Sequence, residues 1–288
     1  MKKVFIIITT LLILSTQLYA TTVSIPWSTS YVGCADWTNE GQQDTGCDGL
    51  EYQLDNHCPK EGSAEEWEEI SIDANNPTGD GGKGQIHWIA DGENMQSGST
   101  RVDFANQTEL WIRYYFKYPL GFKWTSNFVG EKQVYINQGG TYVIPHWYTH
   151  DRLRAYVNGG DRGHVHWGWD NLMVNGATDG NGHKEADGQW HYLETYILAG
   201  ASGAMKIWVD GVLRLNLSGI SMPSSFYNMV IGSNQKYPDN CPGNALCTPS
   251  CVPMYYDDIA ISDEGYIGPI AGTPPTPISL VIRMHFLD

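Results

Sequence analysis

Basic residues are scarce in this chain, which carries 17 Lys and Arg against 32 Asp and Glu and has a formal net charge of −15 at pH 7. A nucleic acid or another polyphosphate would have to bind against this repulsive field, so nucleic acid is excluded as an expected partner. An acidic polysaccharide is not excluded. A local basic cleft outweighs distant acidic charges, because salt screens them within about 8 Å.

Long apolar runs are absent after the N-terminus. The first residues contain Lys2 and Lys3, an apolar run from Val4 to Leu14, and a Leu-Tyr-Ala exit that ends at Ala20, which together predict a secretory signal peptide over residues 1–20. No later stretch reaches the roughly 20 consecutive apolar residues that a membrane-spanning helix needs. We therefore expect a secreted or periplasmic monomer without a membrane span.

The CxxC spacing of a zinc site is also missing, although the chain has six cysteines. An even number of cysteines in an exported chain favours disulfides, and six cysteines allow 15 pairings. The cysteines fall into two groups of three, so at least one bridge is expected between the groups, and the pairing stays open. The two groups are Cys34, Cys47 and Cys58, and Cys241, Cys247 and Cys251.

Helical patterns are sparse, whereas 32 Gly and an aromatic content of 12% suit a sheet protein rich in turns. Short runs that alternate apolar and polar residues predict antiparallel strands near 85–90, 100–105, 109–118, 132–137, 152–157, 163–169, 190–198, 205–210, 212–217, 228–233 and 255–262. Asp210-Gly211 predicts a type I′ hairpin turn, and residues 158–161 a looser one. The sequence thus predicts an all-β antiparallel sandwich.

Four segments follow from this pattern. The signal peptide is followed by an N-terminal part of the sandwich over 21–79 with three of the cysteines, and by the sandwich core over 80–270. Residues 271–288, which contain Pro274, Pro275 and Pro277, are expected to form a Pro-rich linker or tail.

Alternation also separates the two faces of each strand, because successive side chains point to opposite sides. In the strand over 109–118, Leu110, Ile112, Tyr114 and Phe116 are expected to point into the core. The residues left on the outside of this and other strands are rich in rings and cations, which is the composition of a groove that stacks sugar rings and bonds their hydroxyls. The predicted groove residues are Trp111, Arg113, Tyr115, Gln133, Tyr135, Asn137, Arg154, Tyr156, His164, His166, Glu194, Tyr196, Lys206 and Trp208.

Four stretches resemble the concanavalin A-like lectin/glucanase superfamily, namely "ELWIRYYFKYPLGFKW", "GQWHYLETYILAGASGAMKIWVDGVLRL", "NMVIGS" and "YYDDIAISDEGYIGPI". The resemblance covers roughly residues 80–270 and implies a jelly roll. Within this superfamily the strands "WIRYYFKY" and "WHYLETYIL" are similar to those of secreted bacterial polysaccharide lyases of the heparin lyase-like and glucuronan lyase-like kinds.

Such lyases cleave uronic-acid polymers by β-elimination, in which one group neutralises the carboxylate, a base removes the C5 proton and an acid assists the leaving oxygen. The resemblance therefore implies catalytic roles for Arg113, Tyr135, Arg154 and His166, and substrate contacts for the other groove residues. It implies no required cofactor. A structural calcium ion with Asp258 among its oxygen ligands is also implied by the superfamily.

Two other patterns are missing. A retaining glucanase of this fold would carry Glu-x-Asp-x-Glu on one strand, and the sequence has no such string. The tripeptide Gln-Ile-His at 85–87 is similar to one of alginate lyases, but the companion elements are absent, and we assign no role to His87.

Three hypotheses remain: a lyase that acts on an acidic glycan, a non-catalytic glycan-binding module, and an adhesive surface module.

Overall fold

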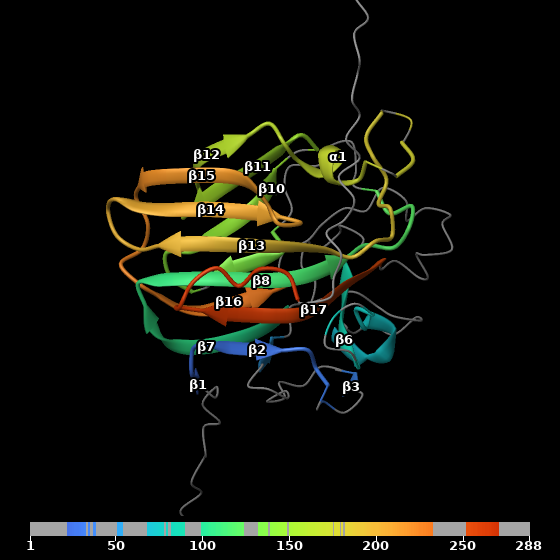
Figure 1. Cartoon of the computed structure of the whole chain (residues 1–288), viewed down its shortest axis with the longest axis horizontal. Coiled ribbons are helices and arrows are strands. Elements are labelled where there is room, and N and C mark those ends of the chain that lie inside the picture. Colours follow the sequence, from blue (N-terminus) through green and yellow to red (C-terminus); the bar gives the residue numbers. More distant parts are fainter. Residues whose placement is uncertain are drawn as a thin grey trace, which may run out of the picture.

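The computed structural model describes residues 22–32, 34, 37–38, 51–53, 68–77, 79, 82–89, 99–123, 132–137, 139–148, 150–174, 176–178, 180, 182–232 and 252–270. Two sheets lie face to face across one core, and helix is confined, in this part of the chain, to two short segments (Figure 1). These are η2 (Ile72–Ala74) and α1 (Trp169–Leu172). The predicted all-β sandwich is confirmed.

Sheet A runs in the order β1-β7-β16-β9-β10-β11-β12, with β4 paired to β7. Its pairs are antiparallel except for β1 and β7, which are parallel. Its strands are β1 (Thr22–Val23), β4 (Glu51–Gln53), β7 (Ser99–Gln107), β9 (Val134–Ile136), β10 (Val143–Tyr148), β11 (Arg152–Val157), β12 (Gly160–Val165) and β16 (Phe226–Ile231).

Sheet B runs in the order β15-β14-β13-β8-β17-β6-β5-β3, with β2 paired to β17. In Figure 1 it is the nearer layer, and β8 lies between β13 and β17. Its strands are β2 (Trp27–Thr29), β3 (Trp37–Thr38), β5 (Glu68–Ser71), β6 (Gly84–Ile89), β8 (Glu109–Lys117), β13 (His191–Leu198), β14 (Gly203–Val209), β15 (Val212–Ile220) and β17 (Val252–Ser262).

The core forms between the inner faces of the two sheets, as alternation predicts. Leu110, Ile112, Tyr114 and Phe116 of β8 are at most 1% exposed and belong to one apolar cluster. The same cluster contains inner residues of sheet A, among them Val134, Ile136, Leu153, Ala155 and Val157. Burial of a large apolar side chain contributes about 1.5–3 kcal/mol, so these alternating positions fix which face of each strand points inward.

Two tight turns follow the chemistry expected of them. Asp210 and Gly211 have φ angles of 47° and 76°, as a type I′ turn requires at both central positions. Asn158 and Gly159, with φ angles of 45° and 82°, make the corresponding turn between β11 and β12. Strand β12 therefore starts at Gly160, a few residues before the predicted start at 163.

Strand β10 was not expected from the sequence, because Pro145 lies in its middle. Proline lacks a backbone N–H and is tolerated where one side of a strand does not donate hydrogen bonds to a neighbouring strand. The described pairing between β9 and β10 is limited to Val143 opposite Ile136, so Pro145 has a partner, Ala155, on the β11 side alone. A strand with a proline thus occupies a central position of sheet A.

Several predictions fall on residues that the structure does not describe. They include the signal peptide, the tail over 271–288 and five of the cysteines, while Cys34 itself is buried. The disulfide framework and the segment boundaries stay predictions. Among the described residues, none of the helices has the length and apolar character needed to cross a bilayer.

Candidate functional site

The predicted groove residues lie on both sheets rather than on one. Because the sheets enclose the core between them, their outer faces look to opposite sides of the sandwich. The outer residues of sheet A among them are Tyr135, Arg154, Tyr156, His164 and, just after β12, His166; those of sheet B are Trp111, Arg113, Tyr115, Glu194, Tyr196, Lys206 and Trp208. The prediction that all of them converge on a single groove is wrong, and their individual roles stay predictions.

On sheet B, the chain itself covers the outer face. The segment over 263–270, called the strap here, turns back from β17 across β8 (Figure 1). The two carboxylate oxygens of Glu194 accept the backbone N–H groups of Ile267 and Gly268 at 2.7 and 2.9 Å. Glu194 is 0% exposed as a result.

Arg113 is held by the same strap. Its Nη1 donates to the carbonyl of Gly268 at 3.0 Å, and its Nη2 donates to the carbonyl of Asp258 at 3.3 Å. The hydroxyl of Tyr115 accepts the backbone N–H of Ile270 at 3.1 Å. Burial raises the pKa of Glu194, although the strap amides and Arg113 oppose the shift. Arg113, Tyr115 and Glu194 therefore fasten the strap, which is contrary to the prediction that they face a sugar.

The rest of the sheet B set forms a smaller aromatic surface. Trp208 packs on Tyr266 of the strap, with ring centroids 5.3 Å apart. Trp111 lies 4.7 Å from the ring of Tyr196, and the Nζ of Lys206 lies 5.2 Å from the centre of that ring. The structure thus brings Trp111, Tyr196 and Lys206 together, away from Arg154.

Two amide residues of the predicted set are parts of the fold. Gln133 is 0% exposed, and its Oε1 accepts from the hydroxyl of Tyr114 at 2.7 Å and from the Nε1 of Trp147 at 3.3 Å, inside the core. Asn137 has a φ of 61° and bridges to the start of β16, accepting from the N–H of Tyr227 at 2.9 Å. Alternation assigned Gln133 to the outside, but β9 begins only at Val134, and the bend before it breaks the pattern.

Asp258 lies in an irregular part of β17, where the pairing with β8 shifts between Asp257 and Ala260. It has a φ of 50° and is 2% exposed. Its Oδ2 accepts from the Nδ2 of Asn76 at 3.0 Å. Asn76 also donates its backbone N–H to Asp257 at 2.7 Å, so this pair of carboxylates joins β17 to the segment after η2. A calcium ion at Asp258 stays a prediction.

Polar side chains gather on the outer face of sheet A, where strand register places them in rows. His146 of β10 lies opposite Arg154 of β11, which lies opposite His164 of β12. In the next row along, Tyr156 lies opposite Ile144 and Asp161. Side chains directly opposite each other in antiparallel strands have Cβ atoms about 5 Å apart. The row of His146, Arg154 and His164 therefore runs continuously across three strands and is called the arginine strip here.

Arg154 is the centre of this strip. Its Nε donates to the Nδ1 of His146 at 2.9 Å, and its guanidinium lies 3.6 Å from the ring centre of Tyr148 and 4.6 Å from that of Tyr156. The side chain is 11% exposed. Burial lowers the pKa of Arg154, while nearby Asp161 opposes the shift, so the guanidinium remains a cation in a confined position.

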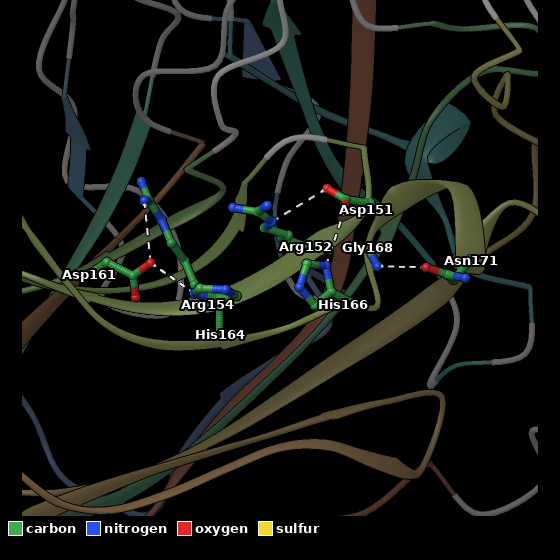
Figure 2. Close-up of polar contacts among 8 residues, drawn as sticks. All are labelled: Asp151, Arg152, Arg154, Asp161, His164, His166, Gly168 and Asn171. Atoms are coloured by element: carbon green, nitrogen blue, oxygen red, sulfur yellow. Dashed lines mark hydrogen bonds and ion pairs between the residues drawn. The ribbon is translucent and has the colours of Figure 1, made fainter.

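Figure 2 shows the polar contacts around this row. The Oδ2 of Asp161 lies 3.9 Å from the Nη1 of Arg154 and 3.1 Å from the Nδ1 of His164. Outside the row, just before β11 and just after β12, the Oδ2 of Asp151 lies 3.3 Å from the Nδ1 of His166, whose side chain is 69% exposed. The ring of His166 lies 5.7 Å from that of His164, so His166 borders the row at its β12 end.

A patch of rings borders the strip. Tyr135, Ile144 and Val230 form a second apolar cluster, distinct from the core, with Tyr142 and Tyr156 packed against it. The Nζ of Lys132 lies 5.8 Å from the centre of the Tyr135 ring. The outer face of sheet A therefore combines cations, phenols and apolar rings.

Four members of this site were missed in the sequence, namely His146, Tyr148, Tyr142 and Asp161. The first two lie on β10, which the proline concealed, although Val143 and Trp147 alternate with Ile144, His146 and Tyr148 as a strand should. Asp161 was assigned to a turn.

A cleft of about 460 Å³ between β2 and the strap is lined by Trp27, Glu264, Tyr266 and seven other residues. Since no lining residue is a cation, we assign this cleft no anionic ligand.

No protein-family model matches the chain, and no curated protein matches its sequence. Solved structures match its fold. Cip1, described as a cellulose-induced protein, aligns with a TM-score of 0.50 and 10% identity over 84% of this chain and 99% of its own. The chain has the concanavalin A-like fold. This finding confirms the fold that the resemblance in the sequence implied.

Two lyases align less closely with this concanavalin A-like sandwich. An endo-β-1,4-glucuronan lyase from the fungus Trichoderma reesei has a TM-score of 0.44 and 13% identity over 73% of this chain and 94% of its own. The alginate lyase Aly36B has a TM-score of 0.41 and 16% identity over 63% of this chain and 81% of its own. At these identities the likeness concerns the fold alone.

Proposed function

We propose that the outer face of sheet A binds an acidic polysaccharide and cleaves it by β-elimination. The observation that supports this most is the position of Arg154, a cation confined between two phenols and oriented by an imidazole. A uronic-acid carboxylate is the group that a guanidinium binds best, through two parallel hydrogen bonds. The adjoining rings of Tyr135, Tyr142 and Tyr156 offer surfaces on which neighbouring sugars stack.

The elimination assigns a separate task to each group. Arg154 neutralises the carboxylate and thereby stabilises the negative charge that develops when the C5 proton leaves. We assign the roles of base and acid to Tyr148 and His164, on the two strands that flank β11: they take that proton and return one to the leaving oxygen. The C4–O bond breaks as the C4=C5 double bond forms, so the reaction needs no water, oxidant or cofactor.

The second candidate function is a glycan-binding module without catalysis, whether lectin-like or adhesive. It is favoured by the number of rings on this face, because stacking and a single cation suffice for binding. Both functions require that the chain reach a polysaccharide outside the cell, and we propose that residues 1–20 direct this export. Structural disulfides and a structural calcium ion at Asp258 belong to the same proposal.

A substrate panel separates the two candidates. Purified protein is incubated with alginate, glucuronan, heparin and pectin while the absorbance of unsaturated uronides is followed. A lyase produces a rising signal with at least one polymer, and Arg154→Lys lowers kcat by roughly 10²–10³-fold, as loss of one charge-stabilising group does. Lys206→Ala, on the opposite face, is the matched control and retains the wild-type rate.

The outcomes are distinct. No increase with any polymer, together with binding on a glycan array that Arg154→Lys abolishes, removes the lyase and leaves the binding module. Binding that is lost in Lys206→Ala but kept in Arg154→Lys would move the site to sheet B and overturn the proposal. Absence of both turnover and binding removes both candidates.

A further inference from the structure

Two histidines and an aspartate meet beside α1, outside the site described above. His150 lies in the turn after β10, Asp170 lies in α1, and His183 lies in the loop that follows. The Nδ1 of His150 is 3.4 Å from the Oδ1 of Asp170, and the Nδ1 of His183 is 3.2 Å from the Oδ2. The three donor atoms all lie within 4.8 Å of one another.

These separations fit ligands that share one ion. Zinc binds imidazole nitrogen and carboxylate oxygen at about 2.0–2.2 Å, so neighbouring ligands in a tetrahedral site lie about 3.3 Å apart. The distance from each carboxylate oxygen of Asp170 to the histidine nitrogen beside it is close to that value. Both contacts are hydrogen bonds in the absence of an ion, and both are longer than the about 2.7–2.9 Å of a tight charge-assisted one.

The two imidazole rings face each other closely. Their centroids are 3.7 Å apart and their planes differ by 9°. Two protonated rings stacked in this way would repel each other, and one carboxylate cannot compensate both charges at contact distance. This stacking therefore disfavours two positive charges at this place, and because a bound ion lies near the plane of each ligating imidazole, one ring turns out of the stack when the ion binds. The neutral imidazole is the form that binds a metal ion.

Backbone contacts orient the carboxylate of Asp170 and join α1 to the turn that carries His150. The N–H of Asp170 donates to the carbonyl of His150 at 2.9 Å, and the N–H of Lys184 donates to the Oδ1 of Asp170 at 2.8 Å. Trp169, which is 0% exposed, donates its Nε1 to the carbonyl of Lys184 at 2.9 Å. A hydrogen bond to a ligating carboxylate oxygen is the kind of outer contact that orients metal ligands.

The cluster is buried on one side and open on the other. The side chain of His150 is 6% exposed, whereas Asp170 and His183 are 28% and 33% exposed, so an ion can enter and keep solvent as a further ligand. Burial alone would raise the pKa of Asp170, but hydrogen bonds from His150, Lys184 and His183 outweigh it and lower that pKa. The carboxylate is thus ionised at neutral pH.

We propose that His150, Asp170 and His183 bind a divalent transition-metal ion, with zinc as the ion that best suits two imidazoles and one carboxylate. The bound ion ties the β10–β11 turn to α1 and to the loop after it. This site is independent of the proposed function, because none of its three ligands contacts Arg154 or its row in the contacts described above.

The test is a zinc titration of untagged protein that has been treated with chelator and then dialysed. Accessible thiols are first blocked under native conditions, since cysteines would otherwise bind zinc. Calorimetry is expected to give one zinc per chain, and the midpoint of thermal unfolding is expected to rise with zinc. Binding should weaken as the pH falls, because protons compete with zinc for the ligand nitrogens.

Two variants remove ligands without emptying the core. His183→Gln and Asp170→Asn are each expected to weaken zinc binding at least tenfold and to abolish the zinc-dependent rise of Tm, while His164→Gln, the matched histidine control, keeps both. If zinc does not bind saturably to the wild type, or binds equally to His183→Gln and Asp170→Asn, the cluster is a hydrogen-bonded His–Asp–His group and the proposal is wrong. Comparing each variant's Tm in chelator with that of the wild type shows whether it is folded.

Discussion

Arg154 donates its Nε to the Nδ1 of His146 across the β10–β11 pair, at 2.9 Å. The hydrogen bond fixes the tautomer of this imidazole, because an Nδ1 that accepts carries no proton. It also fixes the plane of the guanidinium, which leaves the Nη atoms to meet a carboxylate. We therefore interpret His146 as a positioning residue for Arg154.

Replacement of His146 tests this role if the protein is a lyase. His146→Ala is expected to lower kcat roughly 10²-fold, as a misplaced catalytic group does, with a smaller change in KM. His146→Gln offers an amide oxygen to the same Nε and is expected to recover part of kcat. Steady-state kinetics on the preferred polymer measure both. Equal losses in the two variants would show that the imidazole acts on the substrate directly.

The stability of the protein should depend on pH through His191, which is 2% exposed between two aspartates. Its Nδ1 lies 2.8 Å from Asp210 and its Nε2 lies 3.4 Å from Asp187. Burial alone would lower the pKa of His191, but the two carboxylates raise it to about 9. A raised pKa means that the folded state binds the proton more tightly than the unfolded chain does.

The stabilisation from His191 is therefore complete below about pH 6.5 and is lost as pH rises toward about 9. The loss amounts to about 3 kcal/mol, at about 1.4 kcal/mol per pKa unit. Urea unfolding between pH 6 and pH 9.5 measures it, and His191→Gln should flatten the profile. His164→Gln, a change at a more exposed histidine, should leave the slope as it is. A wild-type profile without a slope in this range would contradict the assignment.

Glu194 should contribute stability by holding the strap rather than by touching a ligand. Glu194→Gln replaces one acceptor oxygen by an N–H₂ group that faces a backbone donor, which costs about 1–3 kcal/mol for a buried group. We expect a lower free energy of unfolding and faster proteolysis within 263–270. Glu109→Gln keeps an acceptor for the hydroxyl of Tyr196 and serves as the control. Loss of glycan binding in Glu194→Gln at unchanged stability would contradict this role.

Replacement of Gln133 is expected to lower the stability of the protein without changing its affinity for the glycan. Gln133→Leu leaves the hydroxyl of Tyr114 and the Nε1 of Trp147 without this acceptor inside the core. We expect the free energy of unfolding to fall by about 1–3 kcal/mol, as for other buried polar groups left unpaired. Affinity for the glycan, measured at a temperature where the variant is folded, should stay unchanged. A stable variant with weakened glycan binding would show instead that Gln133 contacts the sugar.

Alternation and turn chemistry were sufficient to predict the class of fold. Leu110 through Phe116 point inward at every second position, since a shift by one residue would expose four large side chains. Asp210-Gly211 is a turn because an Asn or Asp followed by Gly tolerates two positive φ angles at low cost. These are local properties, and a sequence carries them directly.

The site could be predicted only in part, because alternation says which side chains face outward but not from which sheet. Arg113 and Arg154 both face outward, yet β8 and β11 belong to different sheets. Which sheet a strand joins depends on long-range pairing. His146 was missed for a different reason: Pro145 is a local signal against a strand, and the tertiary pairing of β10 overrides it.

The strap has a practical consequence for handling the molecule. Its end at Ile270 is fastened to Tyr115 on the sheet B side, whereas Arg154 looks out from the other side. A resin or electrode attached at Ile270 would hold the protein by its sheet B side. Immobilised in this orientation, it would present the arginine strip to a polymer in free solution.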